Sequence, residues 1–381
     1  MHYLDHAATT PIVPEAKVAL LAFLDGDFGN PSSVHAYGRA ARRGVEDARE
    51  QVAAAIGASP AEITFTAGGT EADNLAVKGV ATKLKGNGNH IVTTAFEHHA
   101  VLHSVEHLQD SGFKVSVVEV GNDGLVDPGR IRDAVRRDTI LVSVMAVNNE
   151  IGTVQDMAGI VAAAKDANRS TLVHSDAVQA LGNIPVDVHR WGVDLASFSA
   201  HKLGGPKGVG ALFVRAGVPV ATQLHGGGHE RGLRSGTLNA AGAAAFGAAA
   251  EVAAKEVHAK AERLLRLRTR LLEGVRAAVP DVVVNGDLDA RVPGNLNVSF
   301  PGGSGETLLL LLDAAGIACS SGSACQSGAL DPSHVLLAIG LEPRLADASI
   351  RFSLGRASTE EDVSAVLEVL PEIVERARKA A

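Results

Sequence analysis

The chain has 381 residues, 46% of them hydrophobic and 20% charged, with a formal net charge of −8 and a pI near 6.0. This length suits two domains or one large α/β domain with an appendage, and the acidic balance argues against nucleic-acid binding as the main role. No signal peptide or membrane span is visible, because the longest leucine run covers only residues 308–312, so we expect a cytoplasmic protein.

Short elements precede the first expected strand. Residues 1–13 are turn-rich, and a helix is expected to begin near Glu15. Residues 27–35 contain glycine, asparagine and proline, which prevent regular structure, and a loop of this composition is usually a plain connector. Apolar side chains then recur at helical spacing over residues 37–56, with charged residues opposite them, which predicts an amphipathic helix.

A glycine-rich turn joins the first expected strand, residues 63–66, to the next helix. Gly69 and Thr70 stand where that helix begins, so free N–H groups and the positive end of the helix dipole can hold a phosphate. A Gly-Gly-Thr turn alone is a weak signal, because it is as often merely a tight loop. Its position between a strand and a helix is the one that a phosphate site requires.

Strands and helices alternate along the middle of the chain. Such alternation predicts a mostly parallel, doubly wound sheet, and therefore an α/β fold. The expected strands are residues 90–94, 114–120 and 139–147, and the expected helices are residues 100–111 and 129–136.

Two further apolar strands, residues 171–174 and 195–198, are each followed by a reactive side chain. Asp176 follows the first and Lys202 the second, at the sheet edge where ligands bind in open α/β folds. Pyridoxal phosphate needs a lysine amine for its aldehyde and a carboxylate for its ring nitrogen. Taken alone, the pair fits equally well a helix N-cap and a solvated surface lysine.

Polar residues follow other expected strands. His98 could stack on a flat cofactor ring or shuttle a proton, but His98 and His99 could also be a hydrogen-bonded pair in a loop. Asn149 and its neighbour Asn148 could simply close a turn. A basic, glycine-rich loop that contains Thr237 fits a contact with a phosphate, either in the same subunit or in a neighbouring one.

The C-terminal part of the chain has a different pattern of helices and strands. An alanine-rich helix at residues 240–254 and a charged helix at residues 256–278 precede three short strands among helices, which indicates a smaller α+β domain. We predict a large domain at 14–253 and a small domain formed by 1–13 and 254–381. Arg351 lies in one of the strands, where burial demands either a core salt bridge or an anionic ligand such as a substrate carboxylate.

The two cysteines differ in their surroundings. They are too few for a disulfide framework, and by themselves they cannot build a metal site, which points to a reduced compartment. Cys319 ends a short apolar run and is expected to be a packed, inert thiol. Cys325 stands among serines and glycines, so we expect an exposed loop on which a thiol without a function would be an oxidation liability.

Ten sequence blocks resemble, in order and over nearly the whole chain, the NifS/IscS-type cysteine desulfurases. They are HAATTP, GNPSSVH, GGTEADN, EHHA, NNEIG, HSDAVQ, SFSAHKLGGPKGVGAL, HGGGHERGLRSGT, SSGSAC and SIRFSLGR. The resemblance implies a homodimer of the pyridoxal-phosphate fold type I, with a seven-stranded sheet in its large domain. It also implies conversion of L-cysteine to L-alanine, with the sulfur left as a persulfide on an enzyme cysteine.

The resemblance assigns roles residue by residue. The catalytic residues would be Lys202, which forms the Schiff base, Cys325, which carries the persulfide, and His98, which stacks on the cofactor ring. The substrate carboxylate would be held by Arg351 and Asn30. The cofactor-binding residues would be Gly69, Thr70, His98, Asn149, Asp176, Gln179, Ser199, His201, Lys202 and, from the partner subunit, Thr237.

The resemblance leaves the sulfur acceptor open among iron–sulfur cluster assembly, tRNA thiolation and DNA sulfuration. We expect a sulfur-acceptor or iron–sulfur scaffold protein as partner, and neither direct nucleic-acid binding nor membrane attachment. Three other functions are weighed against it: a selenocysteine lyase, a simple aminotransferase and a non-catalytic assembly scaffold. The aminotransferase gives Cys325 no role, and intact Lys202, Asp176 and Cys325 speak against the scaffold.

Overall fold

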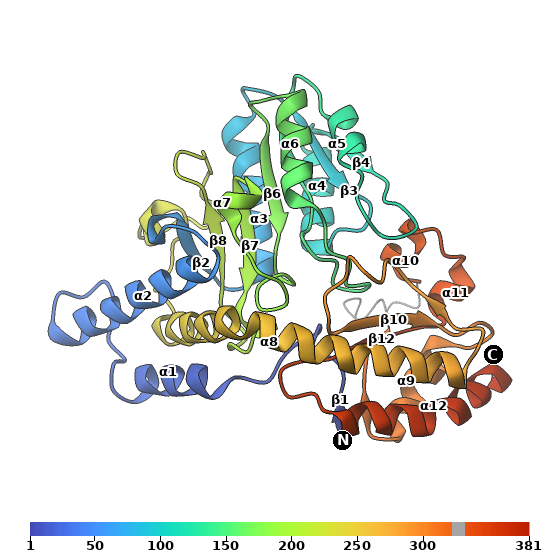
Figure 1. Ribbon diagram of the computed structural model, residues 1–381. Helices are drawn as coiled ribbons and strands as arrows, with labels where there is room; N and C mark the ends of the chain where they lie inside the picture. The colour runs from blue at the N-terminus through green and yellow to red at the C-terminus, as the bar shows by residue number, and fades with distance from the viewer. Residues whose placement is uncertain (322–331, 381) are drawn as a thin grey trace.

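A seven-stranded sheet is the centre of the computed structural model, which describes residues 1–321 and 332–380 (Figure 1). The strand order is β2-β8-β7-β6-β5-β3-β4, in which β8 runs antiparallel to both of its neighbours and the other pairs are parallel. The predicted α/β class, with a mostly parallel sheet, is therefore confirmed. The strands are β2 (Ile63–Thr66), β3 (His90–Thr94), β4 (Lys114–Val118), β5 (Thr139–Ser143), β6 (Leu172–Asp176), β7 (Leu195–Ser199) and β8 (Gly210–Val214).

Helices cover both faces of this sheet because successive strand residues point to opposite sides. Ile91 faces one apolar cluster together with α3 and α4, whereas its neighbour Val92 faces a second cluster that includes α2, α6 and part of α8. The strands are consequently buried almost throughout, except for the edge strand at residues 114–118. The helices are α1 (Pro14–Asp25), α2 (Ala36–Ala55), α3 (Gly69–Leu84), α4 (His99–Asp110), α5 (Pro128–Ala134), α6 (Met157–Ala167) and α7 (Val188–Trp191), with 3₁₀ turns η1 (Pro60–Glu62), η2 (Ala200–Lys202) and η3 (Glu230–Gly232).

The long helix α8 (Ala240–Ala278) has 39 residues and joins the two halves of the molecule (Figure 1). The prediction of two separate helices, at residues 240–254 and 256–278, was wrong. No glycine or proline interrupts the junction, and Lys255 pairs with Glu251 one turn earlier. The change from alanine-rich to charged sequence marks a change of packing partner: the first part lies against the sheet cluster and the last part against a separate apolar cluster.

That separate cluster underlies the C-terminal part of the chain. Strands pair antiparallel in the order β12-β10-β9, and the N-terminal strand β1 pairs in parallel with β11. Residues from both ends of the chain thus share one core, as the proposed small domain at 1–13 and 254–381 requires. The elements are β1 (His2–Tyr3), β9 (Val283–Val284), β10 (Asn295–Ser299), β11 (Ile317–Ala318), β12 (Ser349–Ser353), α9 (Gly305–Ala314), α10 (His334–Ala338), α11 (Pro343–Asp347) and α12 (Glu360–Ala380).

One predicted strand, residues 139–147, was too long. Strand β5 ends at Ser143, although Val144 and Ala146 remain buried and still donate their N–H groups to carbonyls of β6. The apolar pattern therefore continues past the end of the ladder. Among the described residues, no helix has the length and apolar character needed to cross a bilayer.

A buried ion pair fixes the turn η3 that precedes α8. The Glu230 carboxylate accepts hydrogen bonds from Arg49 Nη1 and Nη2 at 2.7 and 2.8 Å and from the Phe65 N–H at 2.8 Å. Glu230 and Arg231 both have left-handed backbone angles, φ 47° and 55°, which a side chain rarely adopts unless its contacts enforce them. The ion pair is therefore what holds this loop against β2.

Replacing Glu230 with glutamine should lower the free energy of unfolding by about 3 kcal/mol, because the Arg49 guanidinium would stay buried without its main anionic partner. Urea unfolding measures the change. Glu375→Gln is the matched control: Glu375 pairs with Lys379 on the exposed face of α12, so its loss should leave the urea midpoint unaltered. Equal midpoints for all three proteins would contradict the structural role of Glu230.

Candidate active site

Most of the predicted site residues meet where the parallel strands end. Asp176 is the last residue of β6, Ser199 is the last residue of β7, and Lys202 ends the turn η2 that follows. His98 lies just before α4, in the connection after β3. The carboxyl ends of parallel strands share one edge, so the fold brings these side chains together as expected.

Lys202 lies under the N-terminal segment. Its ammonium group donates hydrogen bonds to the carbonyl oxygens of Ala7 at 2.7 Å and Ala8 at 2.9 Å. Gln179 also donates to the Ala7 carbonyl, at 2.9 Å. Thr10 binds the His201 carbonyl through both its N–H and its hydroxyl, at 3.0 and 2.8 Å, which fixes this segment against η2. The residue spacing gave no sign that the N-terminus reaches the lysine.

The carboxylate of Asp176 is buried beside two groups that can carry positive charge. It accepts a hydrogen bond from the Val178 N–H at 2.9 Å and faces His98 and Lys202. Burial raises the pKa of Asp176, and the two basic neighbours oppose that rise. Burial lowers the pKa of His98, whose Nδ1 accepts from the Ala100 N–H at 3.1 Å, so the proton of neutral His98 sits on Nε2.

The glycine turn at the start of α3, the predicted phosphate cradle, packs closely against its neighbours. A side chain at Gly69 would place its Cβ 2.6 Å from Val178, so only glycine allows the backbone to approach this closely. The same position lies 3.6 Å from the Cβ of Ser199, and thus the helix start adjoins the end of β7. Thr70 is exposed at the rim, and its N–H belongs to the first turn of α3, where no earlier helical carbonyl is available.

Arg351 projects from β12 toward the same region. It is 2% exposed, and it donates to the Asn149 carbonyl at 2.8 Å and to an Asp5 carboxylate oxygen at 2.9 Å. The core salt bridge, one of the two sequence-based alternatives, is therefore present. Within the described residues, Nε of Arg351 and the side-chain oxygen of Asn149 are buried without a hydrogen-bond partner. Both atoms remain available to a ligand.

Two predicted binding residues lie apart from this group. Asn30 and Thr237 occupy exposed loops, and the Asn30 side chain accepts a hydrogen bond from the nearby Ser32 N–H at 2.9 Å. Neither hydrogen-bonds to Asp176 or Arg351 in the described part of one chain. Asn148, in contrast, closes its own turn by accepting from the N–H groups of Glu150 and Ile151, as one alternative expected.

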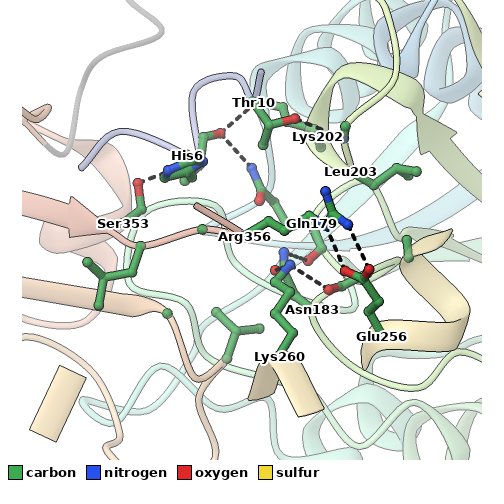
Figure 2. Close-up of a pocket in the computed structure, with 18 of the residues that line it drawn as sticks. His6, Thr10, Gln179, Asn183, Lys202, Leu203, Glu256, Lys260, Ser353 and Arg356 are labelled. Atoms are coloured by element: carbon green, nitrogen blue, oxygen red, sulfur yellow. Dashed lines mark hydrogen bonds and ion pairs between the residues drawn. The ribbon is translucent and has the colours of Figure 1, made fainter. Parts of the chain in front are cut away.

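A cavity of about 700 Å³ opens beside Lys202, between the N-terminal segment, α8 and the chain after β12 (Figure 2). Figure 2 shows Lys260 directed at Asn183, and Glu256 paired with Arg356. Burial lowers the pKa of Lys260 to about 8. The wall shared with the strand-end site includes Asn149, Gln179 and Lys202, so small molecules have space next to the lysine.

The structure describes one of the two cysteines. Cys319 packs against the C-terminal apolar cluster, and burial raises the pKa of its thiol to about 12, which agrees with an inert cysteine. Cys325 lies outside the described residues. The chain on both sides of it is attached near the site, because Ser320 pairs with the backbone of Arg351 and the Ser333 hydroxyl donates to Glu150.

Several buried acids in this region were given no role from the sequence, although Glu97 and Glu150 belong to polar clusters expected at this rim. Asp73 lies on α3 within 4.8 Å of Asp176 and His98, counting the nearest side-chain nitrogen and oxygen atoms. Burial raises the pKa of Glu97 to about 8 and that of Glu150 to about 7. Asp73 lies on the buried side of α3, and no sequence signal marks it, because a single Asp on a helix looks like any solvated residue.

Comparison with known proteins places the chain in a family. Residues 2–366 match the class-V aminotransferase family. The chain is 48% identical over 379 residues to cysteine desulfurase IscS of Clostridium botulinum, covering 99% of this chain and 95% of that protein. It is 50% identical over 380 residues to cysteine desulfurase IscS of an Anaeromyxobacter species, covering 99% and 93%.

Solved structures agree with this result. A NifS-like protein superimposes with a TM-score of 0.93 and 40% identity, covering 99% of this chain and all of that one. The structure of DndA from Streptomyces lividans gives a TM-score of 0.79 with 38% identity, covering 92% and 99%. The chain therefore belongs to the class-V aminotransferase family, whose members depend on pyridoxal phosphate, and within it to the NifS/IscS-type cysteine desulfurases.

Proposed function

We propose that this cysteine desulfurase uses pyridoxal phosphate bound at Lys202 to convert L-cysteine to L-alanine, and that Cys325 receives the sulfur. The observation that carries the proposal is the meeting of Lys202, Asp176 and the glycine cradle of α3 at one sheet edge. A lysine amine, a buried carboxylate and free helix N–H groups are the three kinds of group that this cofactor needs.

The residues present fit the cofactor. Asp176 has few hydrogen bonds for a buried carboxylate and could accept one more from the ring nitrogen. Gly69, Thr70, Ser199 and His201 would hold the phosphate, and His98 would stack on the ring. When bound, pyridoxal phosphate supplies an electron-withdrawing ring that weakens the bonds to the substrate Cα.

The remaining steps belong to side chains of this protein. Lys202 would take the proton from the substrate Cα and return it, since its amine lies at the strand edge and is oriented by two main-chain carbonyls. Arg351 would bind the substrate carboxylate, helped by Asn149 and Asn30. Arg351 can do so through its unpartnered Nε, while its other nitrogens keep their contacts to Asp5 and Asn149.

Cys325 would attack the substrate sulfur as a thiolate. A sulfur–sulfur bond forms while the carbon–sulfur bond breaks, and its electron pair stays on the carbon, which takes a proton and leaves as alanine. Three residues separate Cys325 from the last described residue before it, Ser321, and an extended chain spans about 3.5 Å per residue. Ser320 is bound to Arg351 and Ser333 to Glu150, on either side of Cys325 in the sequence. These contacts support delivery of the thiol to this site.

An exposed apolar stretch at residues 12–37 supports a homodimer. Val18 is 70% exposed, Phe28 is 69% exposed and Val34 is 88% exposed, which is unusual for large apolar side chains so close together. A second copy covering this stretch would also allow its Thr237 to reach the phosphate. IscS-type relatives imply a protein that accepts the sulfur, and we propose an iron–sulfur scaffold as that partner, in the cytoplasm.

Lys202→Ala should abolish both the visible absorbance of the bound cofactor and all alanine formation, because Lys202 supplies the amine at this strand edge in the part of the chain that the structure describes. Lys207→Ala is the control, since Lys207 lies on the following turn and should keep both properties. Absorbance spectra and alanine release measure the outcome. Alanine formation by Lys202→Ala would refute the assignment.

Cys325→Ser should keep the cofactor absorbance and lose sulfur release from L-cysteine, because a hydroxyl does not accept sulfur as a thiolate does. Cys319→Ser should retain full activity, since its thiol is packed and protonated. Sulfide release in the presence of a reductant measures both. Parental rates from Cys325→Ser would show that another nucleophile receives the sulfur.

Arg351→Lys should raise KM for L-cysteine roughly 30-fold, equivalent to about 2 kcal/mol, because an ammonium group cannot replace a planar, hydrogen-bonded guanidinium. Steady-state kinetics measure the effect. Arg378→Lys, at an exposed ion pair with Asp281, should leave KM unchanged. Similar KM values for both variants would show that Arg351 serves the core salt bridge alone.

A further inference from the structure

A second carboxyl group lies buried behind Asp176. Asp73 is 1% exposed, and within the described residues its Oδ1 has no hydrogen-bond partner. The nearest basic group, His174 Nε2, is 3.6 Å from that oxygen and cannot neutralise it, because burial lowers the pKa of His174 to about 3. The Ser197 hydroxyl is within hydrogen-bonding reach of Asp73. An ionised Asp73 would thus be a buried charge without a cation.

The two carboxyl groups compete for one negative charge. Side-chain oxygens of Asp73 and Asp176 lie within 4.8 Å of each other and of a His98 nitrogen, and buried carboxylates at such a distance do not both ionise readily. Asp176 has the Val178 N–H, His98 and Lys202 to stabilise its charge. Within the described residues, the hydrogen-bond donor available to Asp73 is the Ser197 hydroxyl, and burial followed by repulsion from Asp176 raises the pKa of Asp73.

We propose that Asp73 is a positioning residue that holds a proton at neutral pH and thereby keeps the negative charge of the pocket on Asp176. The inference rests on the proposed role of Asp176 as partner of the cofactor ring nitrogen. It concerns a group that does not touch the cofactor but determines which of two acids is ionised there.

A column of hydrogen-bonded side chains beneath the site is consistent with a proton on Asp73. His174 Nδ1 is 2.8 Å from the Ser143 hydroxyl, and its Nε2 is 3.0 Å from the Ser197 hydroxyl. A neutral imidazole has one donor and one acceptor. If Nδ1 donates to Ser143, then Nε2 accepts the hydrogen of Ser197, and the Ser197 oxygen is left to accept a hydrogen from protonated Asp73. The column spans β5, β6, β7 and α3, all buried.

Titratable groups on three neighbouring segments surround the pair Asp73 and Asp176. They are His174 on β6, His98 and Glu97 at the start of α4, and Lys202 on η2. A second negative charge here would favour protonation of His98, and protonated His98 would in turn oppose a charged Lys202. A neutral Asp73 avoids both effects, so the site keeps one anion for one ring nitrogen.

Infrared difference spectroscopy on the cofactor-free protein tests the proposal directly. At pH 7 the wild type minus Asp73→Asn spectrum should contain the carbonyl stretch of a protonated carboxyl group, which shifts in D₂O. The same band should survive in Asp176→Asn. Glu97 should contribute a separate band, which Glu97→Gln identifies. If the band is missing from Asp176→Asn but still present in Asp73→Asn, the proton lies on Asp176 and the proposal is overturned.

Thermal unfolding of the same proteins gives an independent measure. A carboxyl group whose folded pKa is raised contributes stability that is present below its unfolded pKa and is lost as the pH rises through the folded value. The Tm of Asp73→Asn, measured relative to wild type, should therefore rise with increasing pH above 4. A difference that does not vary with pH would contradict the proposal, because an ordinary structural role predicts that result.

The design separates this inference from the proposed function. Both measurements use protein without cofactor, so a failed outcome would leave the desulfurase assignment standing. If Asp73→Asn does not fold, the persistence of the acid band in Asp176→Asn carries the test alone. Loss of that band would overturn the proposal, and its presence together with the Glu97→Gln control would support it.

Discussion

The hydrogen bonds from Lys202 to Ala7 and Ala8 are the contact on which the rest of the site depends. They join residues 195 and 194 positions apart, so the lysine is oriented only when the N-terminal segment is in place. That segment is itself held by β1 on β11 and by the ion pair from Asp5 to Arg351. The amine and the guanidinium are thus linked through one strand of backbone, and a disturbance of either end of the chain reaches both.

Short sequence patterns predicted the strands that are bounded by turn-forming residues. The bounds of β2 and β3 agree with the predicted strands, because Glu62 and the glycines at 68–69 bound β2, and Gly88 and Asn89 precede β3. The break near Ala254 was wrong for a physical reason: the composition of α8 follows its packing partners, which change along an unbroken helix. Strand bounds and helix continuity are therefore decided by contacts that no short window contains.

Some residues of the site could be predicted from the sequence, whereas some of its contacts could not. Strand-end residues such as Asp176 and Lys202 could be found because a reactive side chain directly after an apolar strand is unusual, and the family resemblance then supplied their roles. The contacts of Arg351 with Asp5, and of Asp73 with the group around Asp176, could not be found. They join segments far apart in sequence, and a single Asp on a helix looks like any solvated residue until the fold buries it.

The acids buried under the strand edge hold the loops around the site in place. Glu97 binds the Thr94 hydroxyl and the Met145 N–H, and Glu150 binds Ser333, so each buried carboxyl is used to fix a loop. The loops fixed in this way are the ones that flank His98 and the segment of Cys325. Burial raises the pKa of Glu97 to about 8 and that of Glu150 to about 7, so both carboxyls hold a proton more readily than exposed ones do. Negative charge in the pocket can then be reserved for Asp176, and the positive groups Lys202 and Arg351 stay available for the cofactor and the substrate.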